Sequence, residues 1–123
     1  MLKRFLKNET VQNLHDIRIS LRRLRYNMEL FYGLFERIKF LKFYKMVENL
    51  QDKTGCVRDI HILKQNILLF GNEEKFNIPD RLNVRIDEKE KILNDNLRLI
   101  LFAFLHSGEF KNFMKIIKKK EIL

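Results

Sequence analysis

The sequence predicts an all-α protein, folded as an antiparallel bundle of four to five helices. Apolar residues recur at helical spacing along most of the chain, and no stretch alternates as a strand would. Residues that break helices are rare, with 4 Gly and 1 Pro among 123 residues. Hydrophobic residues make up 46% of the chain, which fits a folded protein. Short loops favour antiparallel neighbours, and the length predicts a single domain over residues 1–123.

The first helix is predicted over about residues 9–32. Asn8 or Thr10 can cap its N-terminus, because a short polar side chain there accepts a hydrogen bond from the first turn. Apolar residues then recur in one stripe, roughly 80° wide, which we expect to be buried. The residues of this stripe are Leu14, Ile17, Leu21, Leu24 and Met28.

Two further helices are predicted over about residues 36–54 and 57–70, with Gly55 ending the first of them. The residues of the 36–54 helix expected to face the core are Phe40, Phe43, Tyr44, Val47 and Leu50. Those of the 57–70 helix are Ile60, Leu63, Ile67 and Phe70.

Residues 71–79 form the only long break, and Pro79 suits the first turn of the helix that follows. That helix is predicted over about residues 80–106. Its second half, residues 93–105, is so apolar that we expect other elements to surround it. A last helix is predicted over about residues 109–119.

The charge of the chain favours an anionic partner. Its formal net charge is +9, which suits nucleic acid, an anionic membrane surface or polyphosphate. Cys56 is the only cysteine and fits a reducing compartment. No signal-peptide pattern is evident, and the most apolar stretch, residues 99–105, is too short to span a bilayer. We therefore expect a cytoplasmic protein.

A stripe of cations lies beside the apolar stripe of the first helix. His15, Arg18, Arg22 and Arg25 fall within roughly 80° of one another, and Glu29 is the only acid among them. Like charges one turn apart repel, so this stripe needs compensation. It is either a solvated face whose arginine stems cover apolar surface, or a binding site for successive phosphates of a polyanion. His15 can bind the anion or fix a neighbouring side chain.

Two other rows of cations are open to two explanations each. The row on the 36–54 helix consists of Lys39, Lys42 and Lys45. A solvated outer face explains this row at least as well as contact with a ligand does. The row on the 80–106 helix consists of Arg81, Arg85 and Lys89. Ion pairing of these cations with the nearby Asp87 and Glu88 explains this row better than contact with a ligand does.

Catalytic motifs find little support in the sequence. Cys56 has no histidine beside it, and Ser20 points away from His15 on the helix. The three histidines lack the spacing of metal ligands, and no glycine-rich phosphate loop is present. We therefore expect a binding module that is not an enzyme and needs no cofactor or metal.

Two segments carry a family resemblance. Residues 14–26, LHDIRISLRRLRY, resemble the opening helix of the CHAD domain, and residues 50–59, LQDKTGCVRD, resemble that family's signature turn between helices. The resemblance covers roughly residues 8–70. It implies non-catalytic binding of inorganic polyphosphate or a similar linear polyanion, with Asp59 orienting a partner. The binding residues it implies are His15, Arg18, Arg22, Arg25, Lys42, Lys45 and Arg58.

The chain is about half as long as the usual CHAD domain, which has two similar bundles and holds the anion in a basic channel between them. The resemblance therefore implies a homodimer in which both arginine stripes face one channel. Two alternatives use the same basic face: nucleic-acid binding, for which no helix-turn-helix signature or aromatic platform is evident, and attachment to a membrane surface.

Overall fold

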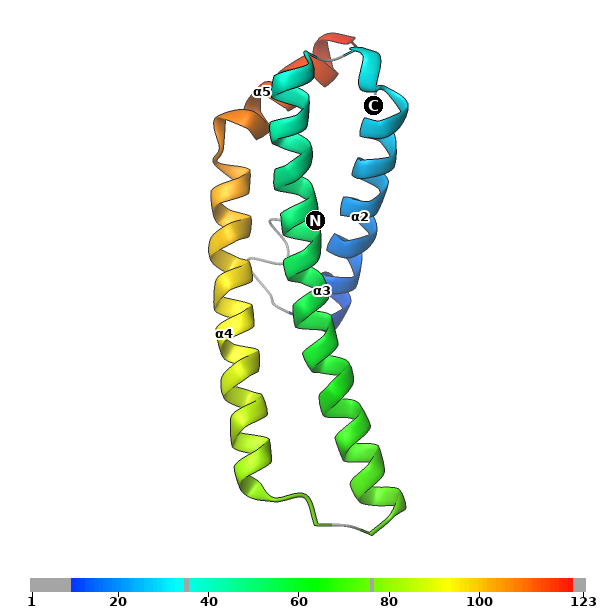
Figure 1. The fold of residues 1–123 in the computed structure, drawn as a ribbon, viewed down its shortest axis with the longest axis vertical. Coiled ribbons are helices and arrows are strands. Elements are labelled where there is room, and N and C mark those ends of the chain that lie inside the picture. The colour runs from blue at the N-terminus through cyan, green and yellow to red at the C-terminus, as the bar shows by residue number, and fades with distance from the viewer. Residues whose placement is uncertain (1–9, 35, 76, 121–123) are drawn as a thin grey trace.

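A computed structural model of the chain describes residues 10–34, 36–75 and 77–120, and these form an all-α fold (Figure 1). Four helices pack together: α2 (Val11–Leu30), α3 (Arg37–Glu73), α4 (Asp80–Leu105) and α5 (Gly108–Lys120). A short 3₁₀ turn, Tyr32–Leu34, follows α2, and the described ranges contain no strand. The predicted fold class is confirmed.

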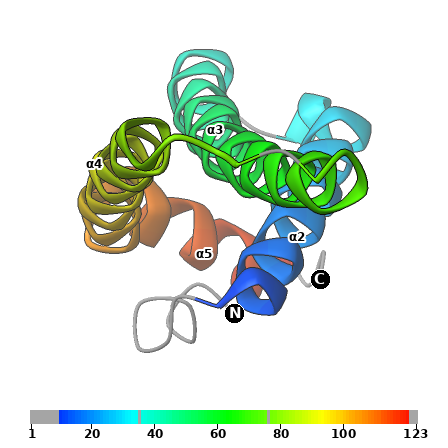
Figure 2. The ribbon, with the colours of Figure 1, turned by 90° about the horizontal axis from the view of Figure 1, so that it is seen from below.

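The helices α3 and α4 form a long antiparallel hairpin, and the other two helices cover only one end of it (Figure 1). The shorter α2 runs antiparallel to the first part of α3, and α5 crosses the end where α3 begins. Seen along the hairpin, α2 and α4 lie on opposite sides of α3, with α5 between them (Figure 2).

The start and the buried face of α2 confirm the prediction. The Thr10 hydroxyl accepts a hydrogen bond of 3.1 Å from the backbone N–H of Asn13, which caps the helix. The other predicted cap, Asn8, lies outside the described residues. The buried residues of α2 are Leu14, Ile17, Leu21 and Met28, with Leu24 packed half-buried beside them.

The predicted break at Gly55 is wrong, because α3 is one continuous helix of 37 residues. Gly55 has a negative φ, so it does not adopt the left-handed conformation that ends helices. A glycine inside a helix costs about 1 kcal/mol relative to alanine. Leu50, Thr54 and Val57 are buried along one stripe that crosses this position, and their burial outweighs that cost.

The predicted inner face of α3 is confirmed only in its first half. Phe40, Phe43, Val47 and Leu50 are buried and Tyr44 is half-buried, and Ile60 is buried as well. Further along, Leu63 and Phe70 are 45% and 54% exposed, so their predicted burial is wrong. The reason is that α2 begins beside the middle of α3 and does not extend over its second half (Figure 1).

The bounds of α4 and α5 confirm the predictions closely, although Pro79 is the N-cap of α4 rather than part of its first turn. Leu97, Leu101 and Phe104 are buried, but Leu99 and Phe102 on the opposite face of α4 are largely exposed. The prediction that residues 93–105 are surrounded is therefore wrong for that face.

Aromatic rings join three of the helices at the covered end. The ring of Phe43 on α3 stacks on Phe104 of α4 and Phe113 of α5, with centroid distances of 5.6 and 4.4 Å. Such contacts add to the apolar burial and fix how the helices meet. None of the described helices has the combination of length and hydropathy needed to cross a bilayer.

Candidate functional site

A hollow of about 270 Å³ lies between the first turns of α2 and the middle of α3. Four of its lining residues can carry positive charge: His15 and Arg18 come from α2, and Arg58 and His61 come from α3. We call these four residues the His/Arg pocket. Two glutamine side chains, those of Gln12 and Gln65, also line the hollow, and none of the residues that line it is acidic.

The structure brings together three of the residues predicted from sequence: His15, Arg18 and Arg58. Arg58 lies on the continuous helix α3, three residues after Gly55, on the side that faces α2. His61 is a site residue that was not predicted from the sequence. Its position three residues after Arg58 is a signal for it, since residues at this spacing lie on the same face of a helix.

The electrostatics of the pocket favour an anion. Burial, followed by repulsion from Arg58 and Arg22, lowers the pKa of Arg18, and the carboxylate of Asp59 opposes part of this effect. The Asp59 carboxylate therefore favours the charged form of the neighbouring Arg18. No ion pair to Arg18, Arg22 or Arg58 occurs within the described ranges. Bringing like charges together is unfavourable, and a bound anion would relieve that repulsion.

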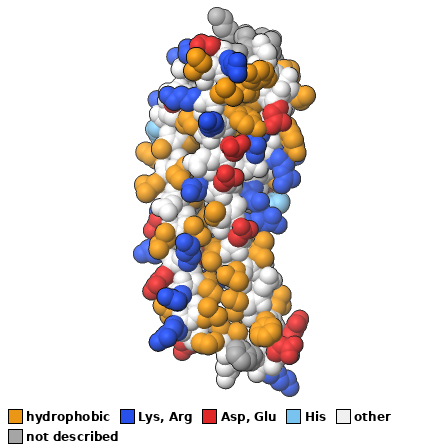
Figure 3. Space-filling view, in the orientation of Figure 1, with side chains coloured by type: hydrophobic (Ala, Val, Ile, Leu, Met, Phe, Trp, Pro, Cys, Tyr) orange, Lys and Arg blue, Asp and Glu red, His pale blue; other side chains and the backbone are white. Residues whose placement is uncertain are grey.

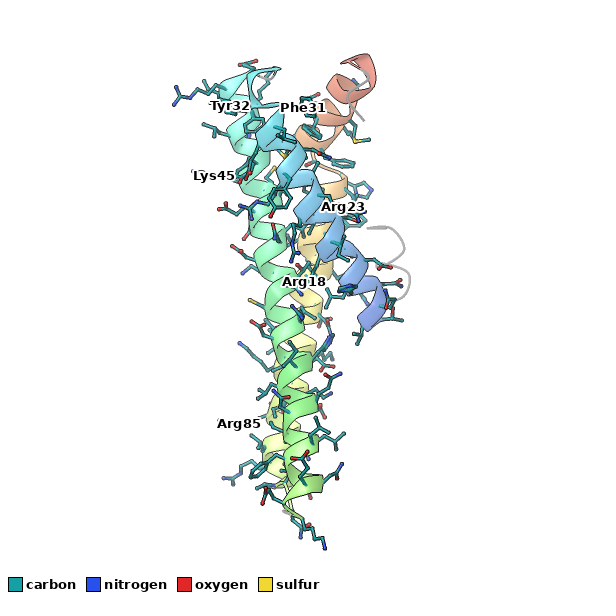
Figure 4. All side chains as sticks on the ribbon, turned by 90° about the vertical axis from the view of Figure 1, so that its right-hand side faces the viewer. Arg18, Arg23, Phe31, Tyr32, Lys45 and Arg85 are labelled. Atoms are coloured by element: carbon teal, nitrogen blue, oxygen red, sulfur yellow. The ribbon has the colours of Figure 1, made fainter. Side chains whose placement is uncertain are left out.

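Two buried nitrogen atoms in the pocket lack a hydrogen-bond partner in the described part of the chain: Nε of Arg18 and Nδ1 of His61. Buried polar atoms are nearly always hydrogen-bonded to protein, water or ligand. The pocket thus offers hydrogen-bonding capacity that a polar ligand or water would use. Arg18 lies beside α3 in Figure 4.

The other arginines of the stripe lie in a second, smaller hollow, where Arg25 is held by α3. Nη1 of Arg25 donates to Gln51 at 2.9 Å, and Nη2 donates to the Tyr44 hydroxyl at 3.0 Å. Nη2 also lies 3.4 Å from a carboxylate oxygen of Glu48. The hydrogen bond with Tyr44 raises the pKa of Arg25. Arg25 therefore joins α2 to α3.

This pairing compensates part of the stripe from within the protein. The Tyr44 hydroxyl, which accepts from Arg25, donates to Glu29 at 2.7 Å. Glu29 is the only counter-charge on the stripe itself, and Glu48 of α3 supplies a second one. Arg22 lines the same hollow of about 190 Å³ and is exposed.

The predicted lysines on α3 lie elsewhere. Nζ of Lys42 forms an ion pair of 2.8 Å with Glu109 of α5, and this pair raises the pKa of Lys42 and lowers that of Glu109. A hollow of about 320 Å³ lies at that place, but its cations, Lys39 and Lys42, pair with Glu36 and Glu109. Lys45 lies at a different level of the bundle from Arg18 (Figure 4). The structure thus separates Lys42 and Lys45 from the His/Arg pocket.

The predicted local pairing of Asp87 on α4 is wrong. Asp87 instead pairs with Lys64 of α3 at 3.0 Å, and Glu90 pairs with the same lysine at 3.2 Å. Arg85, from the same cationic row, lies near the far end of the hairpin (Figure 4). The ion pairs of Lys64 with Asp87 and Glu90 link α3 to α4.

Residues that could perform chemistry do not gather in the described ranges. No group of three His, Cys, Asp or Glu residues there is placed to hold a metal ion. Cys56 is exposed, and Nδ1 of His106 lies 2.9 Å from the backbone oxygen of Phe102. The charged pocket between α2 and α3 therefore remains the candidate site.

The comparisons with known proteins point to the same two helices. The family model of the CHAD domain matches residues 1–67, which is 67 of the 123 residues. No curated protein and no solved structure matches the chain. The matched stretch contains all of α2 and most of α3, so it includes every residue of the His/Arg pocket.

Proposed function

Because the chain belongs to the CHAD domain family, we propose that it binds inorganic polyphosphate, or a similar linear polyanion, without performing chemistry on it. The observation that carries this proposal is the His/Arg pocket, where arginines from two helices meet without an acid in the lining. Arginine suits this task because its planar fork donates two parallel hydrogen bonds to a phosphate and keeps its charge.

The proposal gives the predicted residues different roles. Arg18 and Arg58 bind one phosphate group from opposite sides, with His15 and His61 donating at the edge of the pocket. Arg22, one turn beyond Arg18 on α2, binds the next part of the anion, since one turn spans about 5.4 Å. Arg25 and Asp59 position their neighbours. Lys42 and Lys45 contact the anion only if it is long enough to reach their level of the bundle.

A titration calorimetry experiment with polyphosphates of defined length, at two salt concentrations, tests the proposal. Affinity is expected to fall steeply with salt, because binding releases counterions. The double variant Arg18→Ala, Arg58→Ala should lose affinity by about 10- to 100-fold, since hydrogen bonds to charged groups contribute about 1.5–3 kcal/mol. The matched control is Arg81→Ala, Arg85→Ala, which removes the same charge from the far end of α4.

Two results would contradict the proposal. One is equal loss of affinity in both double variants, which would mean that only the overall charge attracts the anion. The other is tight binding retained by the Arg18→Ala, Arg58→Ala variant. DNA of matched total charge serves as competitor. Displacement of polyphosphate at equal concentration would mean that the face binds polyanions without preference, and displacement at a much lower DNA concentration would make nucleic acid the better assignment.

We also propose that the chain acts as a homodimer, in which the second copy brings its own His/Arg pocket to the same polyanion. The support is that the family usually has two bundles, whereas this chain carries one histidine–arginine motif. Light scattering at micromolar concentration, with and without polyphosphate, tests this part separately. A monomer under both conditions would refute the dimer and leave the binding proposal standing.

A further inference from the structure

The far half of the α3–α4 hairpin, residues 62–92, exposes an unusual number of large apolar side chains. We call this segment the distal hairpin. Its exposed apolar residues are Ile62, Leu63, Leu68, Leu69, Phe70, Leu82, Val84 and Ile92. Figure 3 shows hydrophobic side chains gathered over this part of the molecule. Contiguous apolar patches of this kind mark interaction sites in soluble proteins.

Its position explains why this segment is uncovered by the described helices. The start of α2 lies beside Ile62 and Gln65, where the residues of both helices line one hollow. At the opposite end, α5 packs against Phe43. Neither α2 nor α5 therefore covers the hairpin beyond Gln65 (Figure 1). Ile86 is the only described residue of the distal hairpin that is buried. Helices in proteins owe most of their stability to the packing of an apolar face, and here most of that face is exposed.

Leu68 lies on the same side of α3 as buried core residues. Leu50, Thr54 and Val57 are buried on that side, and the helical spacing runs on through His61 and Lys64 to Leu68, which is 64% exposed. Leu68 also lines a hollow of about 260 Å³ between α3 and α4, together with Ile67, Ile78 and Ile86. The ion pairs of Lys64 with Asp87 and Glu90 keep the two helices together beside this hollow.

The charge of the segment separates it from the rest of the chain. Residues 62–92 contain 6 Lys or Arg and 6 Asp or Glu, so their net charge is zero, and the whole +9 lies in the remainder. A polyanion or an anionic membrane is therefore not attracted to this segment. Two copies of it can approach without the repulsion that the basic parts of the chain would cause.

We infer that the distal hairpin is the surface through which two copies of this chain pair. Their hairpins pack around a two-fold axis and form an intermolecular four-helix bundle, in which Leu68 of each copy completes the core. This inference rests on the homodimer in the proposed function and names its interface. It does not depend on whether the His/Arg pocket binds phosphate.

The interface also predicts how binding depends on the length of the anion. Leu68 follows Arg58 by ten residues, which is about 15 Å along a helix, so an antiparallel pairing places the two pockets about 30 Å apart. A short phosphate chain then binds one pocket at a time. A chain that spans this distance binds both pockets and gains affinity through effective concentration.

Sedimentation velocity of the full chain at micromolar concentrations tests the inference. The unaltered chain is expected to be a dimer, and Leu68→Glu is expected to be a monomer because two carboxylates would be buried at the two-fold axis. The matched control is Leu99→Glu on the outer face of α4. Leu99 is 69% exposed, close to the 64% of Leu68. The Leu99→Glu substitution should leave the dimer intact. Far-UV circular dichroism checks that both variants keep their helices.

A second measurement keeps the test decisive if Leu68→Glu fails to fold. Leu68→Cys in a Cys56→Ser background should cross-link two copies under mild oxidation, whereas Leu99→Cys in the same background should not. In the binding assay, Leu68→Glu should bind tripolyphosphate with the same affinity as the unaltered chain. It should lack only the additional affinity that the unaltered dimer shows for long polyphosphate chains.

Three outcomes would overturn the inference. A dimer that persists in Leu68→Glu but is lost in Leu99→Glu would place the interface on α4 and leave the dimer proposal intact. An unaltered chain that stays monomeric up to about 100 μM would remove both the interface and the dimer. A monomer that floats with uncharged phosphatidylcholine vesicles would assign the distal hairpin to a membrane instead.

Discussion

The two halves of α3 differ in what covers them and in the charge around them. Between Phe40 and Ile60 the helix packs against α2, α4 and α5, and its inward side chains are buried. Beyond Gln65, α4 is the only described helix that accompanies it, and apolar side chains such as Leu68 and Leu69 are exposed. The cations of the candidate site lie beside the first half, whereas the second half belongs to a neutral segment.

This difference teaches that one helix carries two separate surfaces. The covered half is fixed by its core, and beside it lie arginines such as Arg18 and Arg58 that form no ion pair within the described ranges, which suits a charged ligand. The uncovered half has balanced charge and unburied apolar residues, which suits another protein surface of the same kind. The following predictions test this contrast, from the largest expected effect to the smallest.

Truncating one leucine in each region should give the largest contrast in stability. Leu21 is buried between α2 and α3, so Leu21→Ala should lower the free energy of unfolding by about 2–5 kcal/mol. Leu69→Ala in the distal hairpin removes an exposed side chain and should change the unfolding of the monomer by less than about 0.5 kcal/mol. Urea denaturation at low protein concentration measures both. Similar losses would mean that the distal half is covered within one chain.

Removing Arg25 should weaken the junction of α2 and α3 more than it weakens anion binding. Arg25→Ala leaves Gln51, Tyr44 and Glu48 without their partner, so unfolding should become easier by about 1–2 kcal/mol. Arg23→Ala is the control, since it removes the same charge from an exposed position of α2 (Figure 4). If Arg25→Ala leaves stability unchanged and abolishes polyphosphate binding, Arg25 is a ligand rather than a positioning residue.

Replacing Gly55 should stabilise the protein, because this glycine lies inside a continuous helix. A Cβ atom at Gly55 would meet nothing within 4 Å, and its φ is not positive. Gly55→Ala should therefore raise the free energy of unfolding by about 0.5–1 kcal/mol. Thermal unfolding followed at 222 nm measures the change. Destabilisation would indicate that the chain turns here, as the family signature implied.

The ion pair between Lys42 and Glu109 should give the smallest effect, and it should depend on pH. Glu109 has a pKa below its ordinary value of 4.5, so the stability it contributes is present above pH 4.5 and is lost as the pH falls through the lowered pKa. Lys42 has a raised pKa and stays charged throughout this range. The difference in Tm between the unaltered chain and Glu109→Gln should be small at pH 7 and should shrink as the pH falls below 4.5. A difference that grows in acid would contradict this assignment.

Features that depend on one helix alone were predictable from the sequence. The apolar stripe of α2, with Leu14, Ile17 and Leu21, follows from helical spacing, and so does the neighbouring stripe that contains Arg18. The Thr10 cap follows from local chemistry as well. Both rules use only residues within a turn or two, so no knowledge of the packing was needed.

Features that depend on how helices meet were not predictable. The pairing of Arg25 with Tyr44, of Lys42 with Glu109, and of Lys64 with Asp87 each requires the rotation and register of two packed helices. The same holds for His61, which joins the pocket from α3. Gly55 misled the prediction because a local rule for helix ends ignores the buried stripe that crosses it.

Chemical-shift mapping with tripolyphosphate tests the central claim most directly, because it reports which side chains the anion reaches. We predict that the largest changes in ¹H–¹⁵N spectra, the arginine Nε–H and histidine ring signals included, occur at His15, Arg18, Arg58 and His61. Signals of Lys42, Lys45 and Arg85 should change little with so short a chain. If the largest changes occur at Lys42 and Lys45 or along the distal hairpin, the pocket between α2 and α3 is not the anion-binding site.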